Sequence, residues 1–517
     1  MATRRMPGLL ALAVLAAGVA WWTLRGGAPA DDAELAARIE ATCSRCHAFT
    51  PPGILPRSAW RLQIEHMAFL ESYLPEAADG PAVAPPAVET IVAWYEARAP
   101  ERLPLAGPVT RDEPPPLRLS RRSVRLGASS GPGVASVRRV DDALAAEGGP
   151  VLAAANMATG TLHLVSAQRG PRLVGRASHP ARVVAGDFDR DGRIDLAIGD
   201  LGDSLPNEDP LGRVLIARGL PDGSFEMHAV AVELGRVADV LALDLDADGD
   251  LDLLAAAFGF LRTGGIHALY NETPEGGPLA FRSVQITDKV GSVSVVRFDE
   301  ASRGDRPGFA VAFAQHHEVV SVFEPEGDGY RERIVYRAPH PAWGTSHLAS
   351  VDLDADGDTD FLLSNGDSLD DGVAFKPYHG VTWLENRGDD GFEAQRVGAL
   401  HGALGAEAAD LDADGDLDVV AVGFLPQLEL PVPEGAMRVD SVVWFERSAE
   451  GWIPWSIEAD HPRHTGVTIV DFDGDGRLDV VAGINRAWDV EEVEIGPSLE
   501  IWFNEGPVDG SDPDAEP

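Results

Sequence analysis

The sequence predicts a mainly β protein: a seven-bladed β-propeller preceded by a small all-α domain and an N-terminal membrane segment. Three observations lead to this fold class. An aspartate-rich loop, D-x-D-x-D-G-x-x-D, recurs between apolar runs through most of the 517-residue chain. Its copies follow one another at a nearly regular interval. The motif C-x-x-C-H occurs once, in a segment of helical periodicity near the start.

The first element is an apolar run from Pro7 to Leu24, preceded by two arginines. Basic residues before such a run favour a cytoplasmic N-terminus. The run is short for a membrane span and long for the apolar part of a signal peptide. We interpret residues 1–30 as a membrane anchor, because paired tryptophans stand at the outer end. A signal peptide cleaved at Ala28-Pro29-Ala30 is the alternative, and in both cases the rest of the chain is exported.

The only two cysteines, Cys43 and Cys46, are followed directly by His47. This pattern is typical of c-type haem attachment, in which two thiols bond the porphyrin and the imidazole ligates the iron. A redox or structural disulfide is the alternative, but it would favour a thioredoxin-like βαβ context that the sequence lacks. We therefore expect one covalent haem c.

Residues 31–98 contain three segments of helical periodicity, which predict a small haem domain. The iron needs a sixth ligand, and His66 and Met67 are the nearest donors. They point about 100° apart on a helix, so only one of them can face the iron. The segment from Trp60 to Met67 resembles small class I cytochromes c, in which a tryptophan precedes the axial methionine by this distance. The resemblance implies Met67 as the ligand and Trp60 in the haem pocket. His66 is the rival ligand, and a core position is the structural alternative for Met67.

Residues 99–116 are rich in proline and charge and are interpreted as a semi-stiff linker.

The recurring loop predicts calcium sites. Aspartates at positions one, three, five and nine supply hard oxygen ligands, and the glycine at position six permits a sharp bend. An EF-hand is rejected because position twelve holds an apolar residue inside a strand-like run. A solvated acidic turn remains the structural alternative. About five ions are expected, with these ligands: Asp187, Asp189, Asp191, Asp195, Asp244, Asp246, Asp248, Asp252, Asp352, Asp354, Asp356, Asp360, Asp410, Asp412, Asp414, Asp418, Asp471, Asp473, Asp475 and Asp479.

The spacing of the loops predicts the number of blades. They begin at residues 187, 244, 352, 410 and 471, so that one interval is twice the others. A degenerate copy of the repeat, which begins at Arg297, lies in the long interval, and another degenerate copy begins near Val140. Seven units of about fifty residues, each with four strand-like runs, indicate a seven-bladed propeller.

The last unit lacks its fourth strand, which Leu117–Leu126 would supply from before the first blade, leaving no open edge. The repeats resemble the FG-GAP/VCBS family of integrin α-subunits and bacterial surface proteins, over residues 117–506. Residues 507–517 form an acidic tail. The resemblance implies the fold and the calcium loops but no particular activity.

Cationic and imidazole groups precede the first strand of most blades, where they would surround the mouth of the central channel. These are His179, Arg236, Lys289, Trp343 with His347, His401, and Arg463 with His464; His316 and His317 would share the rim. They would bind an anion, a metal, or an acidic peptide or sugar, or they are ordinary polar residues bonded to water and backbone.

The net charge of −41 argues against nucleic acid as a partner. We interpret the chain as a membrane-tethered electron carrier of the bacterial periplasm or cell surface, whose propeller docks a redox partner or envelope component. An oxidoreductase or glycan-active enzyme with its site at the channel mouth is the first alternative. An adhesion or scaffold protein is the second. No catalytic residues stand out in the sequence.

Overall fold

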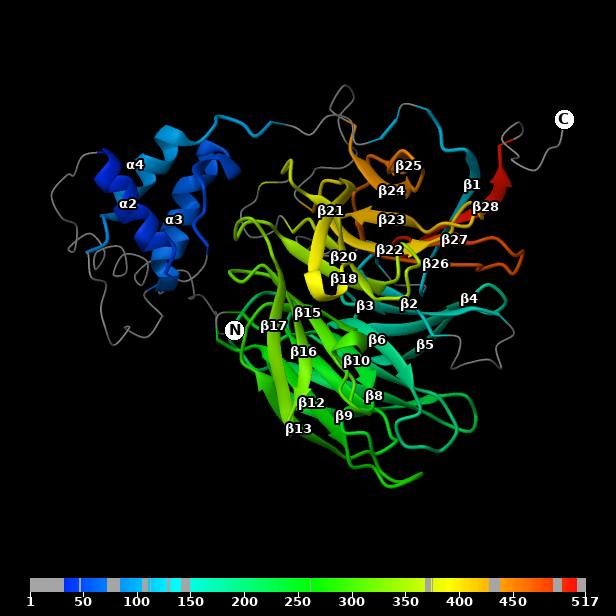
Figure 1. Cartoon of the computed structure of the whole chain (residues 1–517). Coiled ribbons are helices and arrows are strands. Elements are labelled where there is room, and N and C mark those ends of the chain that lie inside the picture. Colours follow the sequence, from blue (N-terminus) through cyan, green and yellow to red (C-terminus); the bar gives the residue numbers. More distant parts are fainter. Residues whose placement is uncertain are drawn as a thin grey trace, which may run out of the picture. The chain divides into compact units, whose positions relative to one another are not determined.

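The computed structural model describes residues 32–45, 48–71, 84–104, 110–111, 113–127, 131–140, 149–260, 262–367, 373, 375–426, 438–486 and 495–508. The predicted anchor and nearly all of the predicted tail lie outside these residues. The described residues belong to two compact units, one helical and one built of β-sheets (Figure 1). The helical unit takes its residues from 1–105 and from the short segments Pro339–Ala342 and Ser368–Pro377.

The helical unit contains a single-turn 3-10 helix and three α-helices: η1 (Pro52–Ile54), α2 (Asp32–Cys43), α3 (Arg57–Glu71) and α4 (Val88–Arg98). The apolar stripe of each α-helix enters one core, which includes Ile39, Trp60 and Tyr95. Helix α4 ends just before Pro100, as expected because proline disfavours helical conformation in the residue before it. The three predicted helical segments are confirmed. Among the described residues, no helix is long and apolar enough to cross a bilayer.

The β unit consists of seven sheets, each of four antiparallel strands. Blades 1 to 3 contain β2 (Val134–Arg139), β3 (Val151–Asn156), β4 (Thr161–Ser166), β5 (Gly170–Arg176); β6 (Pro180–Gly186), β7 (Asp195–Asp200), β8 (Gly212–Gly219), β9 (Phe225–Leu234); and β10 (Val237–Leu243), β11 (Asp252–Ala257), β12 (Gly265–Asn271), β13 (Phe281–Thr287). Blades 4 and 5 contain β14 (Ser292–Arg297), β15 (Phe309–Phe313), β16 (Val319–Glu326), β17 (Gly329–Arg337); and β18 (Thr345–Val351), β19 (Asp360–Asn365), β20 (Gly380–Asn386), β21 (Phe392–Ala399). Blades 6 and 7 contain β22 (Ala403–Ala409), β23 (Asp418–Gly423), β24 (Asp440–Glu446), β25 (Ile453–Ala459); and β26 (His464–Val470), β27 (Asp479–Ile484), β28 (Leu499–Pro507), β1 (Leu117–Val124).

The sheets close into a ring (Figure 1). The first strand of each blade lies beside the first strand of the next, and β26 of blade 7 lies beside β2 of blade 1. These first strands are therefore the innermost ones, around a central channel. The predicted seven-bladed propeller is confirmed.

Burial explains the sequence pattern of each blade. The second strands, such as β7 and β23, are buried along their whole length, which accounts for the continuous apolar run after each aspartate loop. Outer strands such as β17 are mostly exposed or half-buried. The core lies between neighbouring blades, where residues such as Leu162 of blade 1 and Ile198 of blade 2 share one cluster. Each blade is thus stable only in contact with its neighbours.

Ring closure uses the strand that the sequence assigned to it. Strand β1 pairs antiparallel with β28, from Val124 opposite Leu499 to Leu117 opposite Pro507. The last blade therefore combines strands from the two ends of the propeller sequence, and β28 extends one residue beyond the predicted boundary at 506. This pairing covers the edge that β28 would otherwise expose.

Residues near the start and in the second half of the predicted linker form hydrogen bonds. The Arg57 amide donates to the Pro100 carbonyl within the helical unit, at 2.8 Å. The Thr110 hydroxyl donates to Asp440 within the propeller, at 3.0 Å. Ordered structure therefore extends into residues 99–116 from either side.

Candidate functional site

The aspartate loops connect the innermost strand of a blade to its second strand. In blade 6, the amides of Asp414 and Gly415 donate to the two carboxylate oxygens of Asp410, each at 3.1 Å. Ala413 and Gly415 adopt positive φ values of 63° and 102°, so the chain turns back around the first aspartate. All five loops repeat the two amide bonds from positions five and six to position one.

The aspartate at position nine also has a backbone role. Asp418 is buried and accepts hydrogen bonds from the amides of Leu411 and Arg447, at 3.2 and 2.8 Å. Burial raises the pKa of Asp418 to about 7. Asp195, Asp252, Asp360 and Asp479 make the equivalent pair of bonds. Each of these carboxylates accepts one amide from the loop and one from the end of the third strand, and so connects the two. This role does not depend on whether the same carboxylate also binds a cation.

The remaining aspartates converge. In blades 3, 5 and 6, one oxygen from each of positions one, three and five lies within 4.8 Å of the others; in blade 2 the group is formed by Asp187, Asp189 and Asp195. Burial raises the pKa of Asp412 to about 6, and the charge of Asp414 adds to the rise. Oxygen ligands crowded around one point fit the requirements of Ca²⁺.

Two arginines enter the loop of blade 2, whereas one, Arg477, pairs with Asp475 in the loop of blade 7. Arg218 pairs with Asp189 and Asp191, and Arg193 pairs with Asp191. Two guanidinium groups therefore offset carboxylate charge that would otherwise attract a cation. We expect this loop to bind calcium more weakly than the loop of blade 6.

In the helical unit, Cys43 is the last residue of α2, and its half-buried side chain packs against the apolar core. The Tyr95 hydroxyl lies 3.9 Å from its Sγ atom, and burial raises the pKa of the thiol. Phe49 packs against the same core. A flat apolar group bonded to Cys43 would therefore meet aliphatic and aromatic side chains, which fits a porphyrin. Cys46 and His47 lie outside the described residues.

Trp60 is buried, and its ring lies 4.2 Å from the ring of Tyr95. Its Nε1 donates to the Pro52 carbonyl at 3.0 Å. Met67, two turns further along α3, is 44% exposed, and the neighbouring His66 is also exposed. Both donors are therefore accessible in the described helix, so the choice between them as sixth ligand stays a prediction. A recess of about 440 Å³ runs along α2 and α4 beside Asp32 and Trp94, and neither donor lines it.

Most of the predicted channel-mouth residues lie at the starts of the innermost strands, on the rim opposite the aspartate loops, whereas His316 and His317 lie in the turn between β15 and β16. However, their side chains already have partners. Lys289 pairs with Glu332, Arg236 donates to the Ser204 carbonyl at 3.2 Å, and Arg463 donates to the Leu425 carbonyl at 2.8 Å.

The histidines of the rim are also engaged. The Nδ1 atom of His179 bonds the Gly202 carbonyl at 3.2 Å, and the rings of His316 and His317 lie 4.0 Å apart. His401 is buried. Arg236, Lys289 and Arg463 are thus bonded within the propeller, and a ligand site at the channel mouth stays a prediction.

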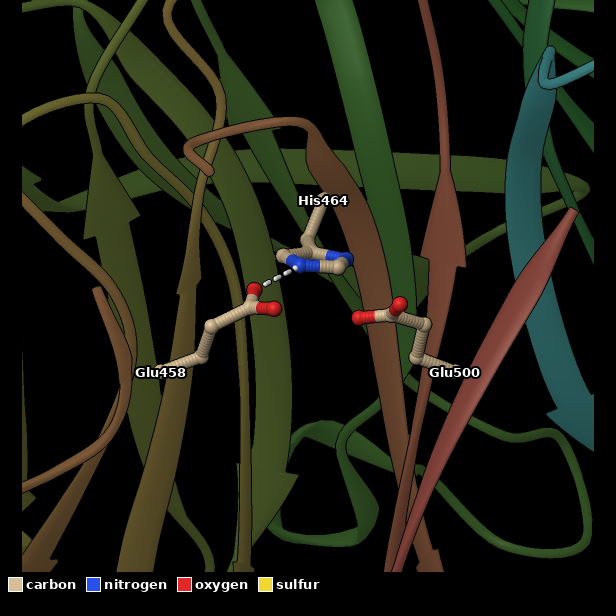
Figure 2. Close-up of side chains that lie close together, drawn as sticks. All are labelled: Glu458, His464 and Glu500. Carbon is tan, nitrogen blue, oxygen red and sulfur yellow. Dashed lines mark hydrogen bonds and ion pairs between the residues drawn. The ribbon is translucent and has the colours of Figure 1, made fainter. Parts of the chain in front are cut away.

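His464 has partners that the sequence did not reveal. It lies between Glu458 and Glu500, and its Nε2 atom is 2.6 Å from Glu458 Oε2 (Figure 2). The two glutamates come from strands β25 and β28, so no local motif in the sequence connects them.

A layer of mostly polar residues on the innermost strands was also missed, apart from His347. In six blades, the innermost strand has a bulge near its start, and the residue that follows the bulge takes the equivalent position in each blade. These residues are Ser136, Arg182, Asp239, Ser294, His347 and Gly405. Asp239 accepts from the Ser294 hydroxyl at 3.2 Å. Burial, together with the charges of Arg182 and Arg138, lowers the pKa of His347 well below its usual value. Because sequence alone does not locate bulges, this register was not visible.

No protein-family model matches the chain, and no curated protein matches it. Among solved structures, the chain is similar to a crystal structure of BBS1N in complex with ARL6DN, soaked with mercury. The two are 11% identical, with a TM-score of 0.43, over 74% of this chain and 97% of that chain. This similarity says nothing of what the present chain binds.

Proposed function

We propose that the protein is an exported c-type cytochrome that transfers single electrons and carries a calcium-stabilised propeller as its docking platform. The observation that carries this proposal is the C-x-x-C-H motif at the end of α2, where Cys43 packs against an apolar and aromatic core. When bound, a haem supplies a centre that gains and loses one electron without a change in the surrounding protein bonds.

The chain's own residues have distinct tasks in this proposal. Cys43 and Cys46 would attach the porphyrin, and His47 would ligate the iron. Met67 would be the further iron ligand, and a thioether ligand raises the reduction potential relative to a second histidine. Trp60 and Tyr95 provide a rigid apolar wall, since their rings pack together in the core. An apolar wall excludes water and limits the reorganisation that accompanies electron transfer.

The propeller is the part that recognises the partner. Carboxylates of its aspartate loops converge on points that suit Ca²⁺, and a bound ion would stiffen one face of each blade that carries such a loop. The net charge of −41 favours a basic or neutral partner surface. The partner would be a redox protein or an envelope component, and an N-terminal anchor would hold the pair close to the inner membrane.

The proposal is tested by expressing the full chain in a host that attaches c-type haem. We expect a low-spin haem spectrum that persists after denaturation, because thioether bonds hold the porphyrin. The double variant Cys43→Ser/Cys46→Ser should lose it. Met67→Ala and His66→Ala are matched variants of adjacent helical residues, and only the first should abolish the low-spin signature. A wild-type protein without haem from that host would exclude electron transfer by this route.

A further inference from the structure

Three buried side chains converge at the boundary between blades 6 and 7 (Figure 2). Glu458 lies near the end of β25, His464 begins β26, and Glu500 is the second residue of β28. They are 8%, 1% and 8% exposed, respectively. One donor atom from each lies within 4.8 Å of the other two.

Neighbouring groups hold each of the three side chains in place. The Nδ1 atom of His464 bonds the Gly483 carbonyl at 3.2 Å, so Nε2 is the nitrogen that faces the carboxylates. Arg121 donates to Glu458 Oε1 at 2.5 Å, and Ser123 donates to Glu500 Oε1 at 3.3 Å. Metal-binding histidines and carboxylates are oriented in this way by a surrounding layer of hydrogen bonds.

The two carboxylates of the cluster lie close together in a buried place. Arg121, which is half exposed, pairs with Glu458 and lies 3.6 Å from Glu500, and the Nε2 atom of His464 also faces Glu458. A divalent cation bound by the three donor atoms would take the place of the proton between Nε2 and Glu458, and the two carboxylates would neutralise its charge.

We propose that Glu458, His464 and Glu500 form a site for a divalent transition-metal ion of the Zn²⁺ class. One imidazole nitrogen with two carboxylates suits Zn²⁺, whereas Ca²⁺ prefers oxygen ligands throughout. The site is distinct from the aspartate loops, because His464 begins β26 whereas the loop of blade 7 follows the end of that strand.

The position of the site suggests its role. Its ligands come from the outer strand of blade 6 and from two strands of blade 7, and β1 supplies Arg121 and Ser123. Strand β1 is the one that closes the ring. A metal ion here would therefore fasten the closing blade to its neighbour and stabilise the folded state through its binding free energy.

The test uses the full chain, produced in a host that attaches c-type haem and saturated with Ca²⁺ to fill the aspartate loops. Zn²⁺ is then titrated while binding and the thermal midpoint are recorded. Glu500→Gln is the central variant, because the amide keeps the shape of the side chain and its acceptor oxygen but is a poor metal ligand. Glu318→Gln is the matched control, a buried carboxyl of blade 4 outside the cluster.

We expect the wild type and the control to bind one Zn²⁺ more than Glu500→Gln, with affinity at the site reduced on the order of 100-fold or more in that variant. Zn²⁺ should raise the thermal midpoint of the first two proteins only. Equal binding and an equal shift in Glu500→Gln would overturn the proposal.

A second measurement on the wild type avoids any folding defect of the variant. X-ray absorption of the protein with its first equivalent of Zn²⁺ should show one imidazole among oxygen ligands. A shell of oxygen alone would place the ion in the aspartate loops and would equally overturn the proposal.

Discussion

Blades 4 and 6 solve the same structural problem in different ways. Each must hold the turn between its first and second strands. In blade 6, carboxylates converge around one point, with the amides of the loop bonded to Asp410. In blade 4, the turn contains a short 3-10 helix and arginines: Arg303 donates to Glu324 at 2.9 Å, and Arg306 donates to the carbonyls of Leu245 and Gly327 at 3.0 and 2.8 Å.

The turn of blade 4 is held by the positive charge of its own arginines, whereas the loop of blade 6 is proposed to take a cation from solution. A guanidinium is always charged and is part of the chain, so the turn of blade 4 needs nothing from solution. Aspartates in the blade 6 loop repel one another until a cation arrives. If the blade 6 loop binds calcium as proposed, exchanging a few residues decides whether a propeller turn depends on calcium.

Removal of calcium should have the largest effect, because it acts on several blades at once. Each filled site contributes roughly 2.7 kcal/mol at a hundredfold excess of free ion over the dissociation constant. Calorimetry with calcium and with a chelator should therefore show a large fall in the thermal midpoint. Hydrogen exchange should locate the loss of protection in the loops of blades 3, 5 and 6 but not in the turn of blade 4. An equal loss of hydrogen-exchange protection in blade 4 would contradict the proposed difference between the two kinds of turn.

The substitution Asp414→Asn should weaken cation binding at a single loop, that of blade 6. The amide keeps its backbone bonds but removes one ligand charge, so the variant should lose about 2–3 kcal/mol of unfolding free energy in calcium. In chelator it should be at least as stable as the wild type, because repulsion is relieved. Asp299→Asn is the control in blade 4, where an exposed pair with Arg297 makes a difference below about 1 kcal/mol in either condition. If Asp414→Asn were destabilising to the same degree in both conditions, the loop would be an acidic turn.

The turn of blade 4, which arginines hold, should have a stability that does not depend on calcium. Arg306→Ala removes donors from three carbonyl groups and should cost about 1–2 kcal/mol, with or without calcium. Chemical unfolding in both conditions measures this, and Arg306→Lys should recover part of the loss. A cost that appeared only in chelator would show that blade 4 also depends on calcium.

Blade 4 also contains a carboxyl group that should make stability depend on pH. Burial raises the pKa of Glu318 to about 8, and its side chain accepts from the Thr345 amide at 3.0 Å. Because the folded state holds this proton more tightly than the unfolded state, stability should fall as the pH rises from about 4.5 to 8. Glu318→Gln should remove this slope, so its stability relative to the wild type should rise by several kcal/mol, up to about 5 kcal/mol, between pH 4 and pH 9. A difference that is the same at pH 5 and pH 9 would contradict the assignment.

The repeat architecture was predictable because each blade carries its own signal. The loops mark the end of every innermost strand in five blades, and the interval of double length revealed the blade around Arg297 that has lost them. Closure by Leu117–Val124 followed from the absence of a fourth strand in the last unit. These features are local or periodic, so the sequence displays them directly.

The pairing of side chains across blades was not predictable in the same way. Glu458 and Glu500 meet His464 only after two blades have packed together. Likewise, a carboxylate at position nine looks identical whether it ligates a cation or accepts amides, and only the structure shows the bonds from Leu411 and Arg447 to Asp418. The arginines that hold the turn of blade 4 are not part of the aspartate-loop pattern, so the pattern did not predict them.

The central claim is that one covalent haem precedes a ring of calcium-bound blades. Mass spectrometry of the full chain, produced in a haem-attaching host and measured first in native and then in denaturing buffer, tests both parts together. We expect about five calcium ions in native buffer, all lost on denaturation, and one haem that remains bonded to the denatured chain. A denatured mass equal to that of the polypeptide alone would contradict the account.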